Sequence, residues 1–118
     1  MVRENDRELL IAAYANFNAR AIDSVLALMH PEVDWPNGME SGRVHGHEGV
    51  REYWTRQWGL INPHVQPLDF RIEEDGRITV IAHLIIRNLD GAVIVDENVK
   101  HTYLIEDGVI RKMDIGEE

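Results

Sequence analysis

Hydrophobic residues recur every three or four positions through the first half of the chain, a spacing typical of amphipathic helices. One helix is expected from about Asp6 to Asn18, and a second from about Ala21 to Met29. The second helix should end near His30, because Pro31 disfavours the α conformation in the residue before it. A third helix is expected to follow the loop at 41–47 and to run to about Trp58.

After Gly59 the hydrophobic pattern changes to alternation, which is typical of β-strands. Turn signals rich in aspartate, asparagine and glycine separate the alternating segments. Both faces of the segment 77–87 are apolar, so this strand should lie inside the sheet, whereas 68–73 should form an edge. With one short strand between the second and third helices, the expected strands are Glu32–Trp35, Leu68–Glu73, Arg77–Arg87, Ala92–Ile105 and Val109–Ile115.

This order of elements predicts an α+β fold, in which three N-terminal helices cover one face of a curled and mostly antiparallel sheet. A chain of 118 residues is long enough for one hydrophobic core and too short for two. Residues 1–118 are therefore expected to form a single domain.

Composition and charge exclude several classes of function. The chain has 12 lysines and arginines against 21 aspartates and glutamates, a net charge of -9, so neither nucleic acid nor an anionic membrane is an expected partner. The absence of cysteine excludes disulfide bonds and thiolate catalysis. No apolar run approaches the roughly 20 residues that span a bilayer, and the first residues lack the apolar region of a secretory signal. A soluble, cytoplasmic protein is expected.

Large aromatic residues are concentrated between positions 35 and 58, where all three tryptophans lie. Some of these rings must belong to the core, but packing one short helix does not require so many. Together with apolar residues of the first two helices, they are expected to line a pocket for a flat apolar ligand such as a polyketide or terpenoid fragment. The expected lining residues are Phe17, Met29, Trp35, Trp54 and Trp58, with Tyr14 beside them.

Several motifs resemble the nuclear transport factor 2-like superfamily, most closely its SnoaL-like and ketosteroid isomerase-like branch. The motifs are the helix end Asn18-Ala19-Arg20, the run Ile22-x-x-Val25-Leu26-x-Leu28-Met29-His30-Pro31, the segment Gly46-x-x-Gly49-Val50-Arg51-Glu52-Tyr53-Trp54, and the late hairpin Tyr103–Ile110 with a glycine at its corner. The resemblance covers nearly the whole chain. It implies a cone-shaped half-barrel with a pocket between helices and sheet, and a homodimer formed through the outer sheet face. It implies little about the reaction, because these folds include isomerases, cyclases, dehydratases, hydrolases and non-catalytic binding domains.

The resemblance also implies where a steroid isomerase site would lie. Such a site needs a carboxylate base and an oxyanion hole made of a tyrosine and a protonated aspartic acid. Tyr14 falls at the tyrosine position, although it could equally be a core tyrosine bonded to the backbone. The base position falls at Asn37, whose amide accepts no proton at neutral pH, and the aspartic acid position falls at Lys100 or His101. Steroid isomerisation of that type is therefore disfavoured.

Two histidines are the candidates to replace the missing carboxyl groups. His83 is a strongly polar residue in the middle of an otherwise apolar strand. His101 shares a face of the next strand with Tyr103 and Glu97, and this face is expected to line the pocket. The hairpin would bring Asp96 or Glu97 toward His83, but a one-residue shift in register would reverse the faces. The alternative is that both histidines are satisfied by hydrogen bonds in the core or at a dimer interface.

The expected function is that of a small-molecule-pocket protein, and two hypotheses remain open. One is a cofactor-independent isomerase, cyclase or dehydratase that acts on a flat, apolar polyketide- or steroid-like substrate by acid–base catalysis. The other is a non-catalytic ligand-binding or dimerisation domain. The expected catalytic residues are His83, His101 and Tyr14, and the other ligand-binding residues are Asn37, Glu97 and Tyr103. No metal is expected, because His45 and His47 have ligand spacing without an evident third ligand.

Overall fold

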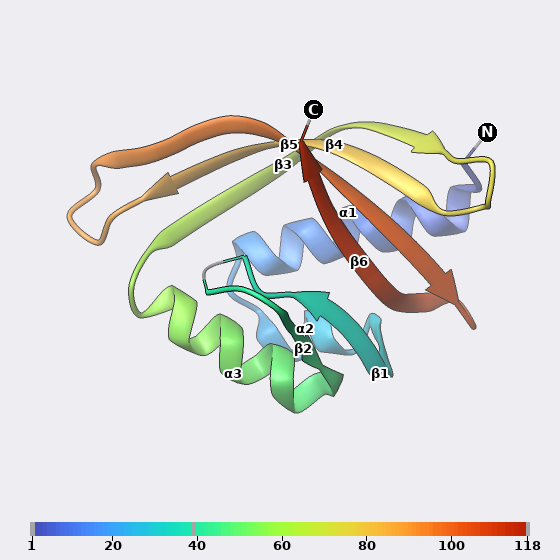
Figure 1. The fold of residues 1–118 in the computed structure, drawn as a ribbon, viewed down its shortest axis with the longest axis horizontal. Coiled ribbons are helices and arrows are strands. Elements are labelled where there is room, and N and C mark those ends of the chain that lie inside the picture. Colours follow the sequence, from blue (N-terminus) through green and yellow to red (C-terminus); the bar gives the residue numbers. More distant parts are fainter. Residues whose placement is uncertain (1, 39, 118) are drawn as a thin grey trace.

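The computed structural model describes residues 2–38 and 40–117 of the chain. Within them, helices pack against one side of a six-stranded sheet that does not close on itself (Figure 1). This confirms the expected α+β half-barrel. The elements are α1 (Glu4–Asn18), α2 (Ile22–Leu26), β1 (Met29–Pro36), β2 (Arg43–His45), α3 (Gly46–Trp58), β3 (Asn62–Ile72), β4 (Ile78–Arg87), β5 (Val93–Glu106) and β6 (Val109–Glu117).

The strand order is β2-β1-β6-β5-β4-β3, and every pair is antiparallel except β1 with β6. Strand β4 lies between β3 and β5, as its two apolar faces predict. The core fills the space between the helices and the sheet face that they cover. Leu10, Val33, Val50, Val80 and Ile110, which come from five different elements, have no exposed surface there.

The second helix is shorter than predicted, and the strand that follows it is longer. Helix α2 ends at Leu26 and not at Met29, which instead begins β1 opposite Ile110 of β6. The Ile110 amide donates a hydrogen bond to the Leu28 carbonyl at 2.9 Å. Pairing with β6 therefore places Met29 in a strand, although the spacing of apolar residues in the local sequence favours a helix.

Strand β3 is also longer than predicted, since it begins at Asn62 and includes Pro63 and Pro67. Prolines are tolerated there because an edge strand pairs its backbone on one side only. On the open side of β3, the side chain of Asn18, the last residue of α1, makes hydrogen bonds to the backbone like those of a neighbouring strand. Its Nδ2 donates to the Val65 carbonyl at 2.7 Å, and the Val65 amide donates to its Oδ1 at 2.9 Å.

Part of the predicted loop at 41–47 is the short strand β2, which Arg43 fastens to the sheet. The Arg43 guanidinium donates to Asp34 on β1, to the Met113 carbonyl and, at 3.0 Å, to Asp114 on β6. Burial alone would raise the pKa of Asp34, but the hydrogen bond and charge of Arg43 outweigh burial and lower it. Arg43 thus joins three strands of the sheet through charge-assisted bonds.

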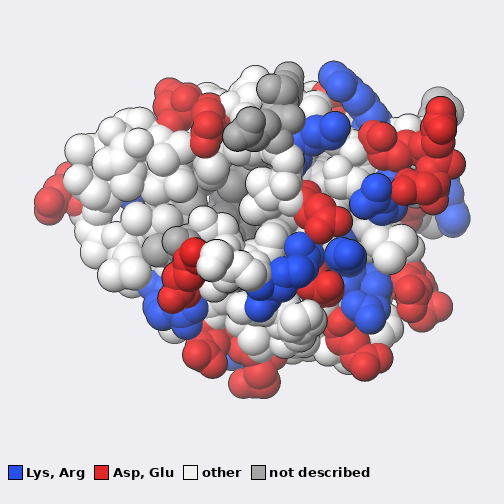
Figure 2. Space-filling model, viewed as in Figure 1, with Lys and Arg blue, Asp and Glu red and all other residues white. Residues whose placement is uncertain are grey.

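Charge is unevenly distributed on the face seen in Figure 2. Acidic and basic side chains lie side by side over the part where β1 and β6 run, whereas the part over the far end of the β4–β5 hairpin is almost uncharged. Leu89, Val93 and Ile94 at this hairpin end are each about half exposed or more. Among the described residues, none of the helices has the length and hydropathy needed to cross a membrane.

Candidate functional site

A cavity of about 60 Å³ lies between the helices and the sheet. Five elements contribute to its wall: α1, α2, β1, α3 and β5. It is lined by Ala13, Tyr14, Phe17, Val25, Met29, Trp35, Trp54, His101 and Tyr103. Tyr14, Phe17, Met29, Trp35, Trp54, His101 and Tyr103 were expected at the site, and the structure brings these seven together.

Aromatic rings form much of the wall. Trp54 of α3 meets Trp35 of β1 edge-on at 5.5 Å between ring centroids, and Phe17 of α1 edge-on at 5.0 Å. Such edge-to-face contacts are the favoured geometry for aromatic pairs. Trp58 does not line the cavity but packs behind this wall, 5.4 Å from Phe17 and 5.8 Å from Trp54.

A chain of three polar side chains lies within these apolar surroundings. The Tyr103 hydroxyl donates to the Tyr14 oxygen at 2.8 Å, and the Tyr14 oxygen lies 2.7 Å from Nδ1 of His101. The Tyr14 and His101 rings are also nearly parallel, with centroids 5.9 Å apart. Within the described chain, the second imidazole nitrogen, Nε2, has no protein partner. It is therefore the ring nitrogen left for a ligand.

Burial keeps all three groups neutral near pH 7. It lowers the pKa of His101 from 6.5 to about 4, because the charged imidazolium loses its hydration in the apolar site. Burial also raises the pKa of Tyr14, with a smaller contribution from Tyr103, and it raises the pKa of Tyr103. The cavity wall thus holds hydrogen-bonding groups without a net charge, and because the surface that faces the cavity is apolar, the wall must move before a ligand can reach them.

The tautomer of His101 decides what these groups present to a ligand. If Nε2 carries the proton, Tyr14 donates to Nδ1, and Nε2–H is a donor. If Nδ1 carries the proton, it donates to the Tyr14 oxygen, which frees the Tyr14 O–H as a donor and leaves a lone pair on Nε2. The second arrangement combines a base with a hydrogen-bond donor.

The structure does not place His83 or Glu97 at this cavity. His83 lies opposite Asn98 in the β4–β5 register, so its side chain is on the sheet face opposite to that of His101. There its Nε2 lies 2.6 Å from Asp96, one of the two predicted partners. Glu97 shares the helix-facing side of the sheet but is exposed, further along the hairpin than His101.

Asn37 also lies outside the cavity lining, in the turn after β1. Its Nδ2 donates to the Glu40 carboxylate at 3.1 Å, and the Glu40 amide donates to its Oδ1 at 2.9 Å. These bonds hold the turn that leads toward β2. Asn37 therefore shapes the loop beside Trp35 in this structure.

Two features of the site were missed by sequence reasoning. Val25 and Ala13 line the cavity, and the helical spacing of apolar residues was the available signal for Val25. The bond between Tyr103 and Tyr14 joins residues 89 positions apart, and no local pattern indicates such a contact.

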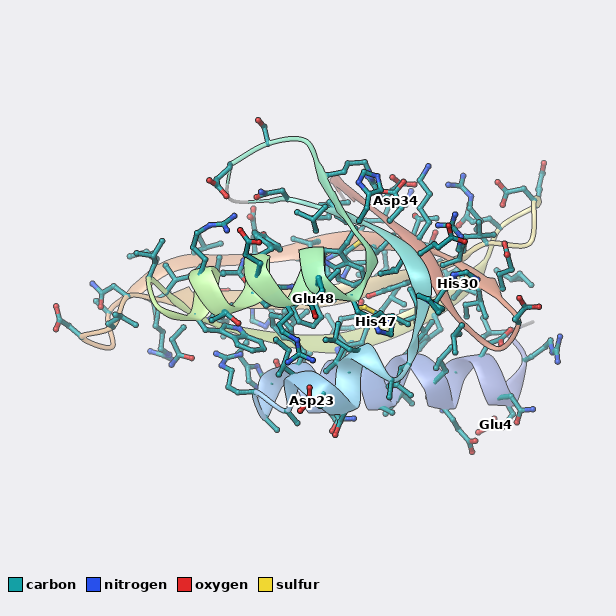
Figure 3. All side chains as sticks on the ribbon, turned by 90° about the horizontal axis from the view of Figure 1, so that it is seen from below. Glu4, Asp23, His30, Asp34, His47 and Glu48 are labelled. Carbon is teal, nitrogen blue, oxygen red and sulfur yellow. The ribbon has the colours of Figure 1, made fainter. Side chains whose placement is uncertain are left out.

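The histidines outside the cavity do not form a convincing metal site. His47 Nε2 lies 2.9 Å from the Met29 carbonyl, whereas the His45 ring faces Asp34. Figure 3 shows His30 and Asp34 on β1 and His47 at the start of α3.

His30 has possible metal-binding neighbours in Glu106 and Asp107, since the ligand atoms of all three lie within 4.8 Å of one another. However, His30 Nδ1 accepts a hydrogen bond from the Glu32 amide at 3.0 Å. In the neutral ring this bond places the proton on Nε2, which leaves neither nitrogen with a free lone pair. The arrangement does not favour a metal.

Comparison with known proteins agrees with the fold. Residues 10–113 match the model of the SnoaL-like domain, and the chain belongs to this family. No curated protein has a significant match to the sequence.

Among solved structures, TerC co-crystallised with polyporic acid is similar, with 26% identity and a TM-score of 0.84 over 98% of this chain and 92% of that one. An NTF2-like protein of unknown function from Burkholderia pseudomallei has 23% identity and a TM-score of 0.84 over the same shares. A Mycobacterium tuberculosis protein in complex with estradiol-17β-hemisuccinate has 16% identity and a TM-score of 0.81, over 98% of this chain and 95% of that one. The last two show the shared fold.

Proposed function

We propose that this protein binds a small, flat and largely apolar molecule with a carbonyl oxygen, and that it moves a proton on this molecule by cofactor-independent acid–base catalysis. The observation that carries the proposal is the Tyr103–Tyr14–His101 chain in the wall of an aromatic cavity. TerC with polyporic acid and the M. tuberculosis protein with estradiol-17β-hemisuccinate support small-molecule binding by this fold.

In the proposed reaction, His101 is the base and Tyr14 the oxyanion donor. His101 carries its proton on Nδ1 and donates to Tyr14, whose O–H then points to the substrate carbonyl oxygen. Nε2 takes a proton from the carbon next to the carbonyl, and the electron pair of the broken C–H bond forms the enolate. The Tyr14 hydroxyl stabilises the enolate oxygen, and the imidazolium returns the proton to another atom of the substrate.

A pKa of about 4 does not disqualify His101 as this base. The aspartate base of ketosteroid isomerase has a pKa of roughly 4.6 and works beside a strong oxyanion hole. Here Tyr103 supports that function, because its O–H donates to the Tyr14 oxygen and strengthens Tyr14 as a donor by cooperativity. Tyr103 is thus a positioning residue in the proposed mechanism.

The cavity sets a limit on the ligand. At about 60 Å³ it is much smaller than the roughly 300–1,000 Å³ typical of ligand pockets. A bicyclic ligand therefore requires the walls to move, and the partly exposed rings of Phe17 and Trp35 are the wall groups with room to do so. Tryptophan fluorescence should report this movement.

The test is hydrogen–deuterium exchange into 2-tetralone, a flat bicyclic ketone with acidic C–H bonds, followed by NMR in deuterated buffer at pH 7. The wild-type protein should accelerate exchange above the buffer rate. His101→Gln should abolish the acceleration, and Tyr14→Phe should reduce it by about 10²-fold, the loss typical of one oxyanion donor.

His83→Gln is the matched control, since His83 lies on the other sheet face, and it should retain the wild-type rate. Binding of 2-tetralone, polyporic acid or estradiol-17β-hemisuccinate without any exchange would contradict the catalytic proposal and favour a non-catalytic binding domain. Equal loss of exchange in His83→Gln and His101→Gln would assign the effect to something other than the cavity.

We also propose that two copies of the chain associate through the sheet face opposite the helices. Leu104 of β5 gives this face an apolar side chain that is 37% exposed, beside Ile81 of β4, which is already buried in the single chain. Sedimentation velocity should give twice the mass of the chain for the wild type, and the mass of one chain for Leu104→Asp. A monomeric wild-type protein would contradict this proposal.

A further inference from the structure

A second concavity, of about 310 Å³, lies where the end of α1 meets strands β3 and β4. Its wall includes Arg20, which follows α1, Asn62 and His64 of β3, and Arg87, the last residue of β4. We call these four residues with their concavity the basic pocket. It is about five times larger than the aromatic cavity, and it shares none of that cavity's lining residues.

The basic pocket is unusual in its charge. Among the described residues, no carboxylate lines it, although the chain as a whole has a net charge of -9. Five arginines elsewhere, Arg43, Arg51, Arg56, Arg71 and Arg77, each form an ion pair with an aspartate or glutamate, whereas Arg3, Arg7 and Arg111 form none within the described part of the chain. No such ion pair involves Arg20 or Arg87 within the described part of the chain.

Arg20 is held firmly in place. Its guanidinium donates to the carbonyl oxygens of Phe17 and Pro63, at 3.1 and 2.7 Å, and to the Asn62 side chain. It also lies 5.1 Å from the centroid of the Trp58 ring. These contacts fix the guanidinium and leave the Nε–H and one Nη1–H without a partner among the described residues.

The backbone of Arg20 adds a second sign of constraint. Its φ is 63°, in the left-handed region that a side chain with a Cβ adopts at a cost. Such strained positions are enriched at functional sites. Here the conformation lets the chain reverse at the end of α1 and brings the guanidinium against β3.

Arg87 supplies the remaining charge. Within the described residues, its one hydrogen bond runs from Nη1 to the Gly91 carbonyl at 3.2 Å, which leaves most of its N–H donors for solvent or a ligand. The Asn62 side chain uses its oxygen on Arg20, so its NH₂ group is a neutral donor at the same place. Donors therefore outnumber acceptors around the pocket.

We propose that the basic pocket binds an oxyanion, the carboxylate or phosphate group of a small molecule, between Arg20 and Arg87. The free N–H groups of Arg87 include a parallel pair that suits carboxylate or phosphate oxygens, and Arg20, whose Nη2 hydrogens are both bonded, can add single hydrogen bonds from Nε–H and Nη1–H. The site is separate from the proposed catalytic cavity and stands whether or not that cavity catalyses a reaction.

The test uses inorganic phosphate and acetate as probes. Each is titrated into ¹⁵N-labelled protein at constant ionic strength, with chloride as the reference anion, and backbone and arginine Nε–H signals are followed. Saturable shifts at Asn62, His64 and Arg87 are expected. Arg87→Gln should weaken binding by about fivefold, and Arg20→Lys, which keeps the charge but loses the hydrogen bonds that fix the guanidinium, should weaken it as well.

Arg71→Gln is the matched control, because Arg71 also lies in β3 but pairs with Asp69. It should bind the probes like the wild type. Saturation by phosphate alone would support a phosphate ligand, and saturation by acetate alone a carboxylate ligand. Absence of saturable shifts at the pocket, or equal weakening by Arg71→Gln and Arg87→Gln, would overturn the proposal.

Discussion

Acidification should destabilise the fold through His101, because the apolar cavity wall holds this imidazole neutral. Above pH 6.5 the ring is neutral in the folded and unfolded chain alike, so it makes no pH-dependent contribution. As the pH falls below 6.5 the unfolded chain binds a proton, while folded His101 resists protonation down to about pH 4. Stability is therefore lost between pH 6.5 and pH 4.

The size of this loss follows from the pKa difference. His101 falls from 6.5 to about 4, and each pKa unit corresponds to about 1.4 kcal/mol, so complete protonation costs the fold about 3 kcal/mol. Most of this cost, about 2 kcal/mol, should appear between pH 7 and pH 5. The carboxylates contribute little in this interval, because the unfolded chain protonates them near pH 4.

Urea unfolding followed by tryptophan fluorescence at pH 7 and pH 5 measures the loss. The wild type should lose about 2 kcal/mol more than His101→Gln, whose amide cannot be protonated in this range. Gln66→Ala, which changes an exposed residue without a titratable group, is the control and should retain the wild-type response. Equal losses in the wild type and His101→Gln would refute the reasoning, as would an NMR titration of His101 with a midpoint near 6.5.

Two further predictions concern the stability of the fold and are measured by urea unfolding at pH 7. Tyr103→Phe should cost about 1 kcal/mol, because it removes the bond to Tyr14 while leaving the Tyr14 oxygen bonded to His101; no loss would mean that the bond contributes nothing. Gly46→Ala should be more destabilising than Gly42→Ala. Both glycines have positive φ, but a Cβ at Gly46 would lie 3.3 Å from a backbone carbonyl oxygen, whereas one at Gly42 would meet open space. Equal losses would show that backbone strain alone decides the cost.

Most of the fold could be predicted because its elements follow local rules. The alternation in 77–87 predicted an internal strand, and the Asp107-Gly108 turn of the last hairpin has the two positive φ values that this dipeptide favours. The errors lie where pairing with a distant strand determines the local secondary structure. Met29 belongs to a strand because β6 pairs with it, and Asn62 begins a strand because β4 does.

The candidate site was harder to predict than the fold, because its chemistry depends on the faces of two paired strands. Alternation placed His101 and Tyr103 together, but it could not settle whether His83 shared their side. The β4–β5 register sets Val80, and not His83, opposite His101. The polar His83 in an apolar strand therefore suggested a functional residue, but the sequence did not tell on which face of the sheet His83 lies.

The same register clarifies what replaces the missing aspartic acid. The resemblance to ketosteroid isomerase-like proteins puts that position at Lys100 or His101, and Lys100 lies opposite Ile81 on the outer face, so His101 is the one of the two that lines the cavity. An aspartic acid there can act as a donor only while burial keeps it protonated. A buried histidine is uncharged in its ordinary form, with one ring proton. Depending on which nitrogen carries that proton, the ring offers either Nε2–H or a lone pair on Nε2. A ligand carbonyl can accept a hydrogen bond from Nε2–H in one tautomer or from the Tyr14 O–H in the other, and only the second leaves His101 able to act as a base.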